Sequence, residues 1–277
     1  MGKFSNVFFA SDFDHTLTGQ DNVLRERNIE AIRCFMSEGG VFTVASGRSI
    51  PLFRRRAARV PVNAPCILYN GGACYDYRDE KLYYAHPLPD FALDIVREAQ
   101  RLDPSLCVEI QGADNHYVFG YNALRDAFLK SEGFSPVLVT DTVPKPWIKI
   151  AVCAGLTSDA LVFTPEDAAR FAEVEQGLKN FCAGRCYVTR SMPYILEIGN
   201  PACSKGGAAR TLAERYERKI LACAGDAPND VSMLDAADFA FVPEDCDEAL
   251  RDKPYIHAAP CGDGTVADAI ERLERLI

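Results

Sequence analysis

Two carboxylates directly after a short apolar run constrain this chain more than any other feature. Residues 7–10 (Val-Phe-Phe-Ala) lead into Asp12 and Asp14, and Thr16 follows two residues later. An uninterrupted apolar run of this length is typical of a strand buried on both faces of a parallel sheet. Because residues two apart in an extended chain point the same way, Asp12 and Asp14 are expected to converge beyond the strand's carboxyl end, where open α/β sheets bind ligands.

Two carboxylates held close together repel each other, so the pair needs a cation, a shared proton or a solvated setting. A hard divalent cation such as Mg²⁺, which prefers oxygen ligands, is one resolution. Asp-x-Asp also occurs in ordinary loops and at helix caps, so the pair alone does not define a catalytic site. The rest of the chain has to decide between these interpretations.

Composition narrows the class of protein. The chain has 277 residues, 48% of them hydrophobic and 25% charged, which is typical of a soluble globular protein with one large or two ordinary domains. The net charge of -9 argues against a nucleic-acid partner but allows a phosphorylated substrate, since a local Lys or Arg can invert the field in one cleft. No apolar stretch reaches transmembrane length, so no membrane partner is expected. Eleven cysteines, mostly in apolar contexts, predict buried thiols in a reducing, cytoplasmic setting.

The first 79 residues have the spacing of strand, helix and strand. Apolar residues at helical spacing predict a helix over 21–38, ended by two glycines, and a second buried strand over 41–45. This strand runs into Ser46, Gly47 and Arg48, at the same kind of strand end as Asp12. A small hydroxyl beside glycine can approach a phosphate oxygen closely, and Ser46 can equally cap the next helix. Arg48 lies nearest the expected cleft.

A third buried strand is expected over 66–69, ending in Asn70-Gly71-Gly72. Asn70 either reaches the same cleft or is a plain turn residue. From about residue 80 the pattern changes to mixed hydrophobic and polar strands, typical of an antiparallel sheet with one open face. We expect an inserted α+β domain over residues 80–195, with strands near 82–84, 108–110, 147–153, 186–189 and 194–198, and helices near 90–102, 123–132 and from Thr164 onward.

Residues 196–277 return to the opening pattern. Ser204 is expected to cap a helix through residue 216, which places Lys205 in its first turn. A cation there opposes the helix dipole, so Lys205 either has an anionic partner or is simply exposed to solvent. A buried strand over 219–224 then leads to Asp226, Asn229 and Asp230, another acidic cluster at a strand end. Asp226 can be read as a turn residue and Asp230 as a helix cap. A strand over 239–242 and a last helix ending at 277 complete this part.

Five motifs now stand in order: Asp12-x-Asp14-x-Thr16, Ser46-Gly47-Arg48, Asn70-Gly71-Gly72, Lys205, and Gly225-Asp226-x-x-Asn229-Asp230. Together they resemble the haloacid dehalogenase (HAD) superfamily of aspartate-nucleophile phosphatases, most of all its Cof-type (HAD-IIB) branch. The resemblance covers essentially the whole chain. It implies an α/β fold in which a Rossmann-like parallel-sheet core, residues 1–79 and 196–277, carries an inserted α+β cap domain, residues 80–195. One position departs from the pattern, since His15 stands where the family usually has glycine.

The resemblance also implies a role for each motif residue. Asp12 is expected to be the nucleophile, and Asp14 to protonate the leaving group and then deprotonate water. Asp12, the backbone carbonyl of Asp14, and Asp226 are expected to bind Mg²⁺, with Asp230 supporting the ion directly or from behind. The residues expected to bind the phosphoryl group or the substrate are Thr16, Ser46, Gly47, Arg48, Asn70, Lys205 and Asn229.

The resemblance implies a Mg²⁺-dependent phosphatase acting on small phosphorylated metabolites, such as sugar phosphates. Two other functions remain open: a phosphomutase or phosphotransferase on the same scaffold, and a non-catalytic sugar-phosphate-binding module. A structural Mg²⁺ or Ca²⁺ domain would leave Ser46 and Lys205 unexplained. Polar and aromatic cap residues that could contact substrate are His116, Tyr117, Lys149, Tyr194 and Glu197. Oligomeric state is left open.

Overall fold

The computed structural model describes residues 2–139, 142–156 and 162–277 and divides into two compact units. The core unit comprises the residues up to Arg48, Phe53–Tyr84 and Cys203–Ile277, and the cap unit comprises Ser49–Leu52 and Ala85–Ala202. Both boundaries lie a few residues beyond the expected ones, at 79/80 and 195/196. The reason is strand pairing, because residues 81–84 pair within the core unit, whereas the cap sheet continues to Gly199.

The core unit contains a five-stranded sheet in the order β14-β13-β12-β1-β2, and every neighbouring pair is parallel. Its strands are β1 (Val7–Ser11), β2 (Val41–Val44), β12 (Ile220–Ala224), β13 (Phe239–Pro243) and β14 (Ile256–Ala258). All five residues of β1 are buried, as the apolar run predicted. The predicted α/β fold with a parallel core sheet is confirmed.

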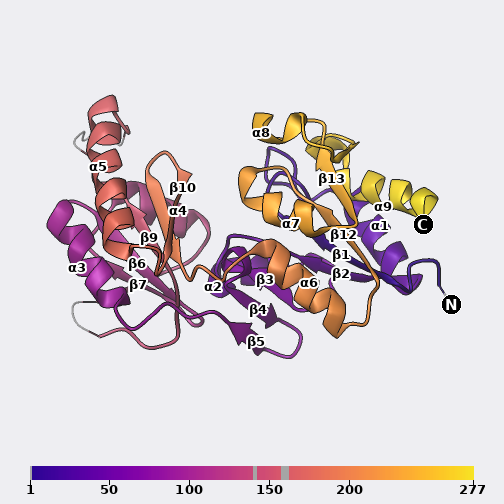
Figure 1. The fold of residues 1–277 in the computed structure, drawn as a ribbon, viewed down its shortest axis with the longest axis horizontal. Coiled ribbons are helices and arrows are strands. Elements are labelled where there is room, and N and C mark those ends of the chain that lie inside the picture. The colour runs from indigo at the N-terminus through magenta and orange to yellow at the C-terminus, as the bar shows by residue number, and fades with distance from the viewer. Residues whose placement is uncertain (1, 140–141, 157–161) are drawn as a thin grey trace. The chain divides into compact units, whose positions relative to one another are not determined.

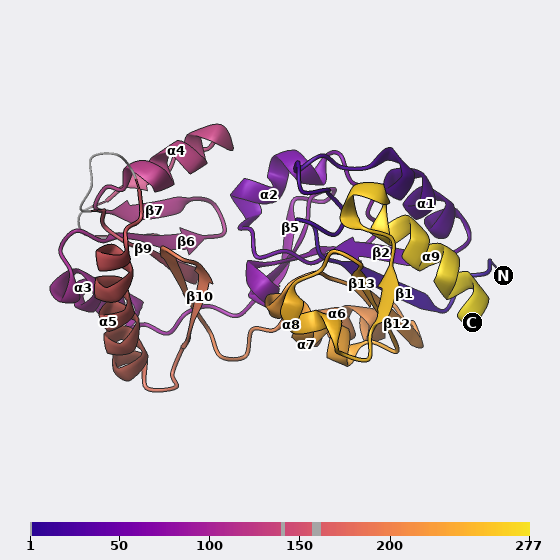
Figure 2. The ribbon, with the colours of Figure 1, turned by 90° about the horizontal axis from the view of Figure 1, so that it is seen from above.

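Helices cover both faces of this sheet (Figures 1 and 2). Helices α1 (Glu26–Ser37) and α9 (Thr265–Leu276) pack together on one face, and α6 (Lys205–Arg215) and α7 (Val231–Ala236) on the other. Two shorter helices, α2 (Ile50–Ala57) and α8 (Glu248–Arg251), follow β2 and β13. Helix α1 begins five residues later than predicted because Asp21 binds the backbone of Val23 and the side chain of Arg25, which holds residues 18–24 in a loop.

A second, three-stranded sheet of the core unit was only partly foreseen. It pairs β3 (Cys66–Leu68), β4 (Ala73–Asp76) and β5 (Lys81–Ala85), with the 3₁₀ turn η1 (Tyr69–Gly71) between the first two. The expected third core strand, β3, therefore lies in this sheet, and the parallel bridge between Ala45 and Ile67 connects it to the end of β2. The strand expected near 82–84 belongs here and not to the cap sheet, which corrects that prediction.

The cap unit is built on a six-stranded, mainly antiparallel sheet in the order β10-β11-β9-β6-β7-β8. Its strands are β6 (Cys107–Gly112), β7 (His116–Phe119), β8 (Val137–Leu138), β9 (Trp147–Cys153), β10 (Tyr187–Met192) and β11 (Ile195–Gly199). Helices α3 (Ala92–Leu102) and α5 (Pro165–Cys182) pack on one face of the sheet around an apolar core (Figure 2). Helix α4 (Ala123–Ser131) lies beside β6, and Thr164 caps α5 as predicted.

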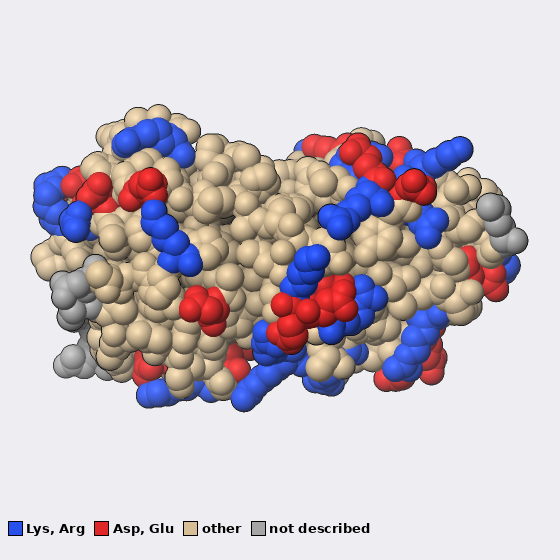
Figure 3. Space-filling model, turned by 90° about the horizontal axis from the view of Figure 1, so that it is seen from below, with Lys and Arg blue, Asp and Glu red and all other residues tan. Residues whose placement is uncertain are grey.

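Three further features bear on the expectations from composition. No helix within the described ranges is long and apolar enough to cross a membrane. Most of the eleven cysteines are buried, as predicted. On the face shown in Figure 3, basic and acidic side chains are interspersed and not separated by sign.

Candidate active site

The carboxyl ends of three neighbouring strands bring the predicted motifs together. The backbone N–H of Asp12 donates to the carbonyl of Ala224 at 2.8 Å, which continues the β1–β12 ladder and places Asp12 beside the Gly225-Asp226 loop. Ser46 comes just after β2, the neighbour of β1 on its other side. The parallel sheet thus collects at one edge residues that are far apart in the sequence.

Lys205 joins two of the aspartates. Its ammonium donates to Asp12 Oδ1 at 2.5 Å and to Asp230 Oδ1 at 2.6 Å, and the residue is only 1% exposed. Ser204 caps α6 by accepting a hydrogen bond from the backbone of Gly207, which fixes Lys205 in the first helical turn. The anionic partner that the helix dipole required is therefore present, and the solvent-exposed interpretation of Lys205 is wrong.

Gly71 sets how close the start of α6 comes to the η1 turn. Its φ is +94°, and a Cβ at this position would lie 2.2 Å from the carbonyl oxygen of Ser204. Only glycine allows both this backbone conformation and this approach. The Asn70-Gly71 turn therefore helps to place Lys205, a role that the sequence pattern did not reveal.

Three carboxylates form a compact group that fits a divalent cation. Oxygen atoms of Asp12, Asp226 and Asp230 all lie within 4.8 Å of one another. Mg²⁺ binds oxygen ligands at about 2.1 Å, so ligands on opposite sides of the ion are roughly 4.2 Å apart. The donor set, its spacing and its excess negative charge over the one ammonium of Lys205 all suit such an ion.

The pKa values of these groups reflect that excess charge. Burial raises the pKa of Asp12 well above its usual range; Lys205 opposes this, and the charges of Asp230, Asp226 and Asp14 add to it. Burial, with the charge of Asp230, raises the pKa of Asp226 to about 6. Burial alone would lower the pKa of Lys205, but Asp12 and Asp230 outweigh it and raise the pKa above its ordinary value. A bound cation would oppose both the burial and the repulsion between carboxylates that raise the pKa values of Asp12 and Asp226.

Asp230 holds the loop that carries Asp226. Its Oδ2 accepts hydrogen bonds from the backbone N–H groups of Asp226 and Ala227, both at 3.1 Å, while Oδ1 accepts from Lys205. Both Asp230 oxygens thus accept hydrogen bonds from the protein. This favours a role in which Asp230 orients the groups that bind the ion over direct binding of the ion by Asp230. The Asp230 side chain is fully buried, so these contacts are shielded from water.

Thr16 lies at the site and contacts one of its carboxylates, whereas its contact with a phosphoryl group or substrate stays a prediction. The Thr16 hydroxyl donates to Asp226 Oδ1 at 2.8 Å, and the residue is fully buried. The contact joins residues 210 positions apart. Thr16 thus orients a carboxylate of the acidic group.

Asp14 and Arg48 form a two-pronged ion pair. Arg48 Nε donates to Asp14 Oδ2 at 2.9 Å, and Arg48 Nη2 donates to Asp14 Oδ1 at 2.8 Å. The backbone N–H of Arg48 also donates to Ser46 Oγ at 3.2 Å. Ser46 is 1% exposed, and the α2 helix begins only at Ile50, with Ser49 accepting from the backbone of Leu52. The helix-capping role considered for Ser46 therefore falls to Ser49.

The remaining predicted residues gather next to Ser46. A Cβ on Gly47 would lie 3.0 Å from Asn70 Oδ1, so the Asn70 side chain packs directly over this glycine. Asn229 Nδ2 donates weakly to Asn70 Oδ1 at 3.5 Å. Asn70 has φ +57°, a conformation that asparagine tolerates better than most residues. The structure therefore brings Gly47, Asn70 and Asn229 together, whereas their contact with substrate stays a prediction.

His15 has the backbone conformation expected of the glycine it replaces. Its φ is +60°, in the left-handed region that favours glycine, and its N–H donates to Thr18 Oγ1 at 3.2 Å. The loop between Asp14 and Thr16 thus keeps a glycine-like path at the modest cost of holding a larger residue there.

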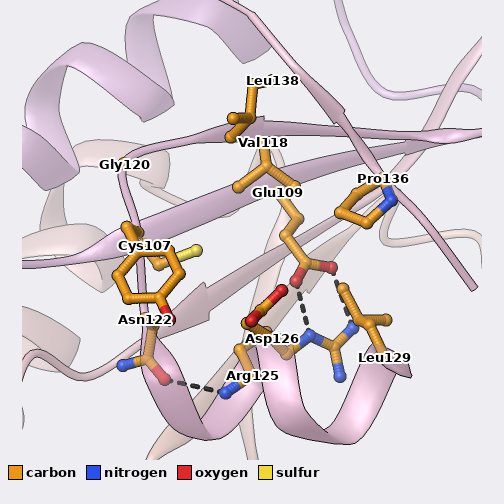
Figure 4. Close-up of a pocket in the computed structure, with 11 residues that line it drawn as sticks. Cys107, Glu109, Val118, Gly120, Asn122, Arg125, Asp126, Leu129, Pro136 and Leu138 are labelled. Carbon is orange, nitrogen blue, oxygen red and sulfur yellow. Dashed lines mark hydrogen bonds and ion pairs between the residues drawn. The ribbon is translucent and has the colours of Figure 1, made fainter. Parts of the chain in front are cut away.

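Within the cap unit, the face of the sheet opposite α3 and α5 carries charged side chains. Lys149 on β9 donates to Glu197 on β11 at 2.6 Å. Arg125 on α4 donates to Glu109 on β6 from Nε and Nη2, at 2.5 and 2.8 Å, at the side of a small pocket (Figure 4). The pocket has a volume of about 40 Å³, which leaves room for only a few water molecules.

Of the other cap residues singled out from the sequence, His116 is fully buried and its Nε2 lies 2.7 Å from Ser49 Oγ. Tyr117 donates to Asp114 at 2.6 Å, and Tyr194 packs against Phe163. Each of these side chains has a partner within the cap unit, and none is placed on a substrate by these contacts.

Comparison with known proteins assigns the family. The model of the haloacid dehalogenase-like hydrolases matches residues 9–267, so the chain belongs to this family. A relative is the 5-amino-6-(5-phospho-D-ribitylamino)uracil phosphatase YwtE of Bacillus subtilis, 25% identical over 287 residues that cover 95% of this chain and 96% of that protein. The predicted family and enzyme class are confirmed.

Solved structures share the fold along nearly the whole chain. A haloacid dehalogenase-like hydrolase from Bacteroides thetaiotaomicron is 22% identical with a TM-score of 0.77, and 96% of this chain and 98% of that one are covered. The HAD subclass IIB sugar phosphatase BT4131 is 17% identical with a TM-score of 0.72, at coverages of 96% and 98%. At these identities the likeness concerns the fold.

Proposed function

We propose that this chain is a Mg²⁺-dependent phosphatase that hydrolyses small phosphorylated metabolites, in particular sugar phosphates, through a phosphoryl group carried on Asp12. The observation that carries this proposal is the contact of Lys205 with Asp12 inside a group of three carboxylates. A carboxylate that attacks a phosphate monoester meets like charge, so positive charge fixed beside the nucleophile is what this chemistry needs.

The first step transfers the phosphoryl group to the protein. An oxygen of Asp12 attacks phosphorus, a bond from Asp12 to phosphorus forms, and the bond to the leaving-group oxygen breaks. Lys205 and the Ser46 hydroxyl hold the phosphoryl oxygens, while Asp14 gives its proton to the departing oxygen. Held by Asp12, Asp226 and the backbone carbonyl of Asp14, Mg²⁺ would supply positive charge against the charge that develops on the phosphoryl oxygens.

The second step returns the protein to its starting state. Asp14, now ionised, takes a proton from a water molecule, and the resulting hydroxide attacks phosphorus. The Asp12–phosphorus bond breaks and inorganic phosphate leaves. Two carboxylates share the work because a cation bound beside Asp12, together with Lys205, would keep Asp12 ionised, whereas Asp14 contacts Arg48 and not Lys205.

Two comparisons support the substrate class. YwtE is named for a substrate with a phosphorylated ribityl chain, and BT4131 is described as a sugar phosphatase. Both point to a phosphate monoester on a hydroxyl-rich organic group. We extend this class, and not either particular substrate, to the present chain.

Phosphate release from a panel of phosphorylated metabolites, with and without Mg²⁺, tests the proposal. We expect metal-dependent turnover that falls by roughly 10³-fold or more in Asp12→Asn, because the amide keeps the size of the side chain but removes the attacking charge. Asp21→Asn, a change at an exposed aspartate of the core unit, is the matched control and should leave turnover unchanged. No turnover on a broad panel, or equal rates for Asp12→Asn and wild type, would contradict the proposal. Transfer to an added sugar in preference to water would favour a phosphotransferase.

A further inference from the structure

The contact between Arg48 and Asp14 is more specific than an ordinary surface ion pair. Both oxygens of the carboxylate accept from the guanidinium, at 2.8 and 2.9 Å. The two side chains are 16% and 31% exposed, so much of the pair is shielded from water. A fork of this kind fixes the plane of a carboxylate as well as its position.

Asp14 depends on such a contact for its direction. It lies in the turn after β1, where no strand ladder orients the side chain. Arg48 in turn is anchored, because its backbone N–H donates to the Ser46 hydroxyl oxygen. The chain thus ties the plane of the Asp14 carboxylate to the segment that carries Ser46.

The same contact bears on the predicted role of Arg48 in binding phosphate or substrate. Two of the Arg48 guanidinium nitrogens donate hydrogen bonds to Asp14. The positive charge of Arg48 is therefore compensated by a carboxylate within the core unit itself. This arrangement suits a residue that aims Asp14 better than one that holds the phosphoryl group.

We propose that Arg48 is a positioning residue that acts through Asp14, holding the carboxylate in line with the leaving-group oxygen. The inference rests on the proposed function and adds a residue to it. Each Asp14 oxygen has its own contact with Arg48, so one contact can hold the carboxyl group while the other oxygen delivers the proton of the proposed mechanism. The proton then passes to the leaving-group oxygen in the first step and is replaced from water in the second.

The nature of the leaving group separates this role from phosphate binding. A sugar alkoxide is a poor leaving group and needs the proton from Asp14, whereas p-nitrophenolate leaves almost without it. Loss of the correct orientation of Asp14 should therefore slow the first step much more for sugar phosphates than for p-nitrophenyl phosphate. Loss of a phosphate-binding residue should affect both esters alike, because they share the phosphoryl group.

The experiment measures kcat and KM of wild type, Arg48→Gln and Arg48→Lys on p-nitrophenyl phosphate and on the sugar phosphate that wild type hydrolyses fastest. We expect kcat for the sugar phosphate to fall about 10- to 100-fold in Arg48→Gln with little change in KM, since general acid catalysis contributes about 10²- to 10⁴-fold. Release of p-nitrophenolate in the first turnover, which reports the first step alone, should fall less than about 3-fold. Arg48→Lys should behave like Arg48→Gln, because a lysine keeps the charge but cannot form the fork.

Two controls complete the design. In Asp14→Asn the first step should show the same selective loss, although hydrolysis of the phosphorylated protein is slowed for both esters. Adding Arg48→Gln should slow the first step little more, because both changes remove one function. Arg54→Gln breaks a comparable fork, from Arg54 to Glu80 at 2.5 and 2.8 Å, and should leave both esters unaffected.

Several results would overturn the inference. Equal losses on both esters with a raised KM would make Arg48 a phosphoryl-binding residue. Full rescue by Arg48→Lys would mean that charge alone suffices. Retained first-turnover release of p-nitrophenolate shows that each variant is folded. Wild-type hydrolysis of both esters tests the proposed function separately, so a failure confined to the Arg48 variants concerns Arg48 alone.

Discussion

Thr16 illustrates how one buried hydroxyl can direct a neighbouring carboxylate. Its bond to Asp226 is 2.8 Å long and shielded from water. Groups behind a metal ligand fix its orientation, and their loss typically weakens metal binding 10- to 100-fold. The sequence motif places Thr16 at the site but does not predict this contact, because the contact joins residues 210 positions apart.

Thr16→Val should weaken Mg²⁺ binding about 10-fold, because valine keeps the shape of threonine but cannot donate to Asp226. At saturating Mg²⁺, kcat should stay within a few-fold of wild type. Titrating activity with Mg²⁺ measures both quantities. Thr16→Ser keeps the hydroxyl and should bind Mg²⁺ nearly as wild type does. Unchanged Mg²⁺ affinity in Thr16→Val would show that Thr16 does not act through Asp226.

The raised pKa of Asp226, about 6, predicts how Mg²⁺ binding depends on pH. The folded, metal-free protein holds this proton more tightly than the unfolded chain, so its stability contribution is present at low pH and is lost as pH rises through about 6. Mg²⁺ requires the ionised carboxylate and competes with the proton, so binding should weaken up to about 10-fold per pH unit below 6. The rise in Tm on adding Mg²⁺ should therefore be large at pH 7.5 and shrink towards pH 5. A Tm rise independent of pH over this range would contradict the assignment.

At the scale of elements, short segments are placed by close contacts between turns and helix starts. The parallel strands follow directly from their apolar runs, and the capped start of α6 follows from Ser204. The β4 strand was missed because all four of its residues are buried, so the sequence shows no alternation of polar and apolar residues. The approach of η1 to α6 was missed because it depends on distances between segments that no local pattern reports.

Gly71→Ala tests that approach. A Cβ there would meet Ser204 O at 2.2 Å in addition to the unfavourable positive φ, so we expect a loss of about 2–4 kcal/mol of unfolding free energy and a large loss of activity through Lys205. Gly184→Ala is the matched control, since Gly184 has φ +78° but nothing within 4 Å of its Cβ position. It should lose only about 1 kcal/mol and keep its activity. Urea unfolding measures the free energy of unfolding of both variants. Equal losses of stability would show that the close approach to Ser204 does not contribute to the effect.

At the scale of the whole molecule, the order of the five motifs predicted the fold class and the set of residues at the site. The division into core and cap was also expected, although strand pairing places both boundaries a few residues closer to the C-terminus. The ion pair between Arg48 and Asp14 was not expected, since the two residues are 34 positions apart and packing sets the conformation of their side chains. The motifs thus predicted which residues lie at the site, and the structure shows which of their side chains contact each other.

The central claim is that Asp12 carries the phosphoryl group, and trapping that group tests it most directly. Asp14→Asn should still be phosphorylated by p-nitrophenyl phosphate, which needs no acid, but should hydrolyse the product slowly because water is no longer deprotonated. After incubation with ³²P-labelled p-nitrophenyl phosphate and Mg²⁺ and quenching in acid, we expect label on the peptide that contains Asp12, and none when Asp12→Asn is added to Asp14→Asn. Label on another residue, or equal labelling without Asp12, would contradict the account.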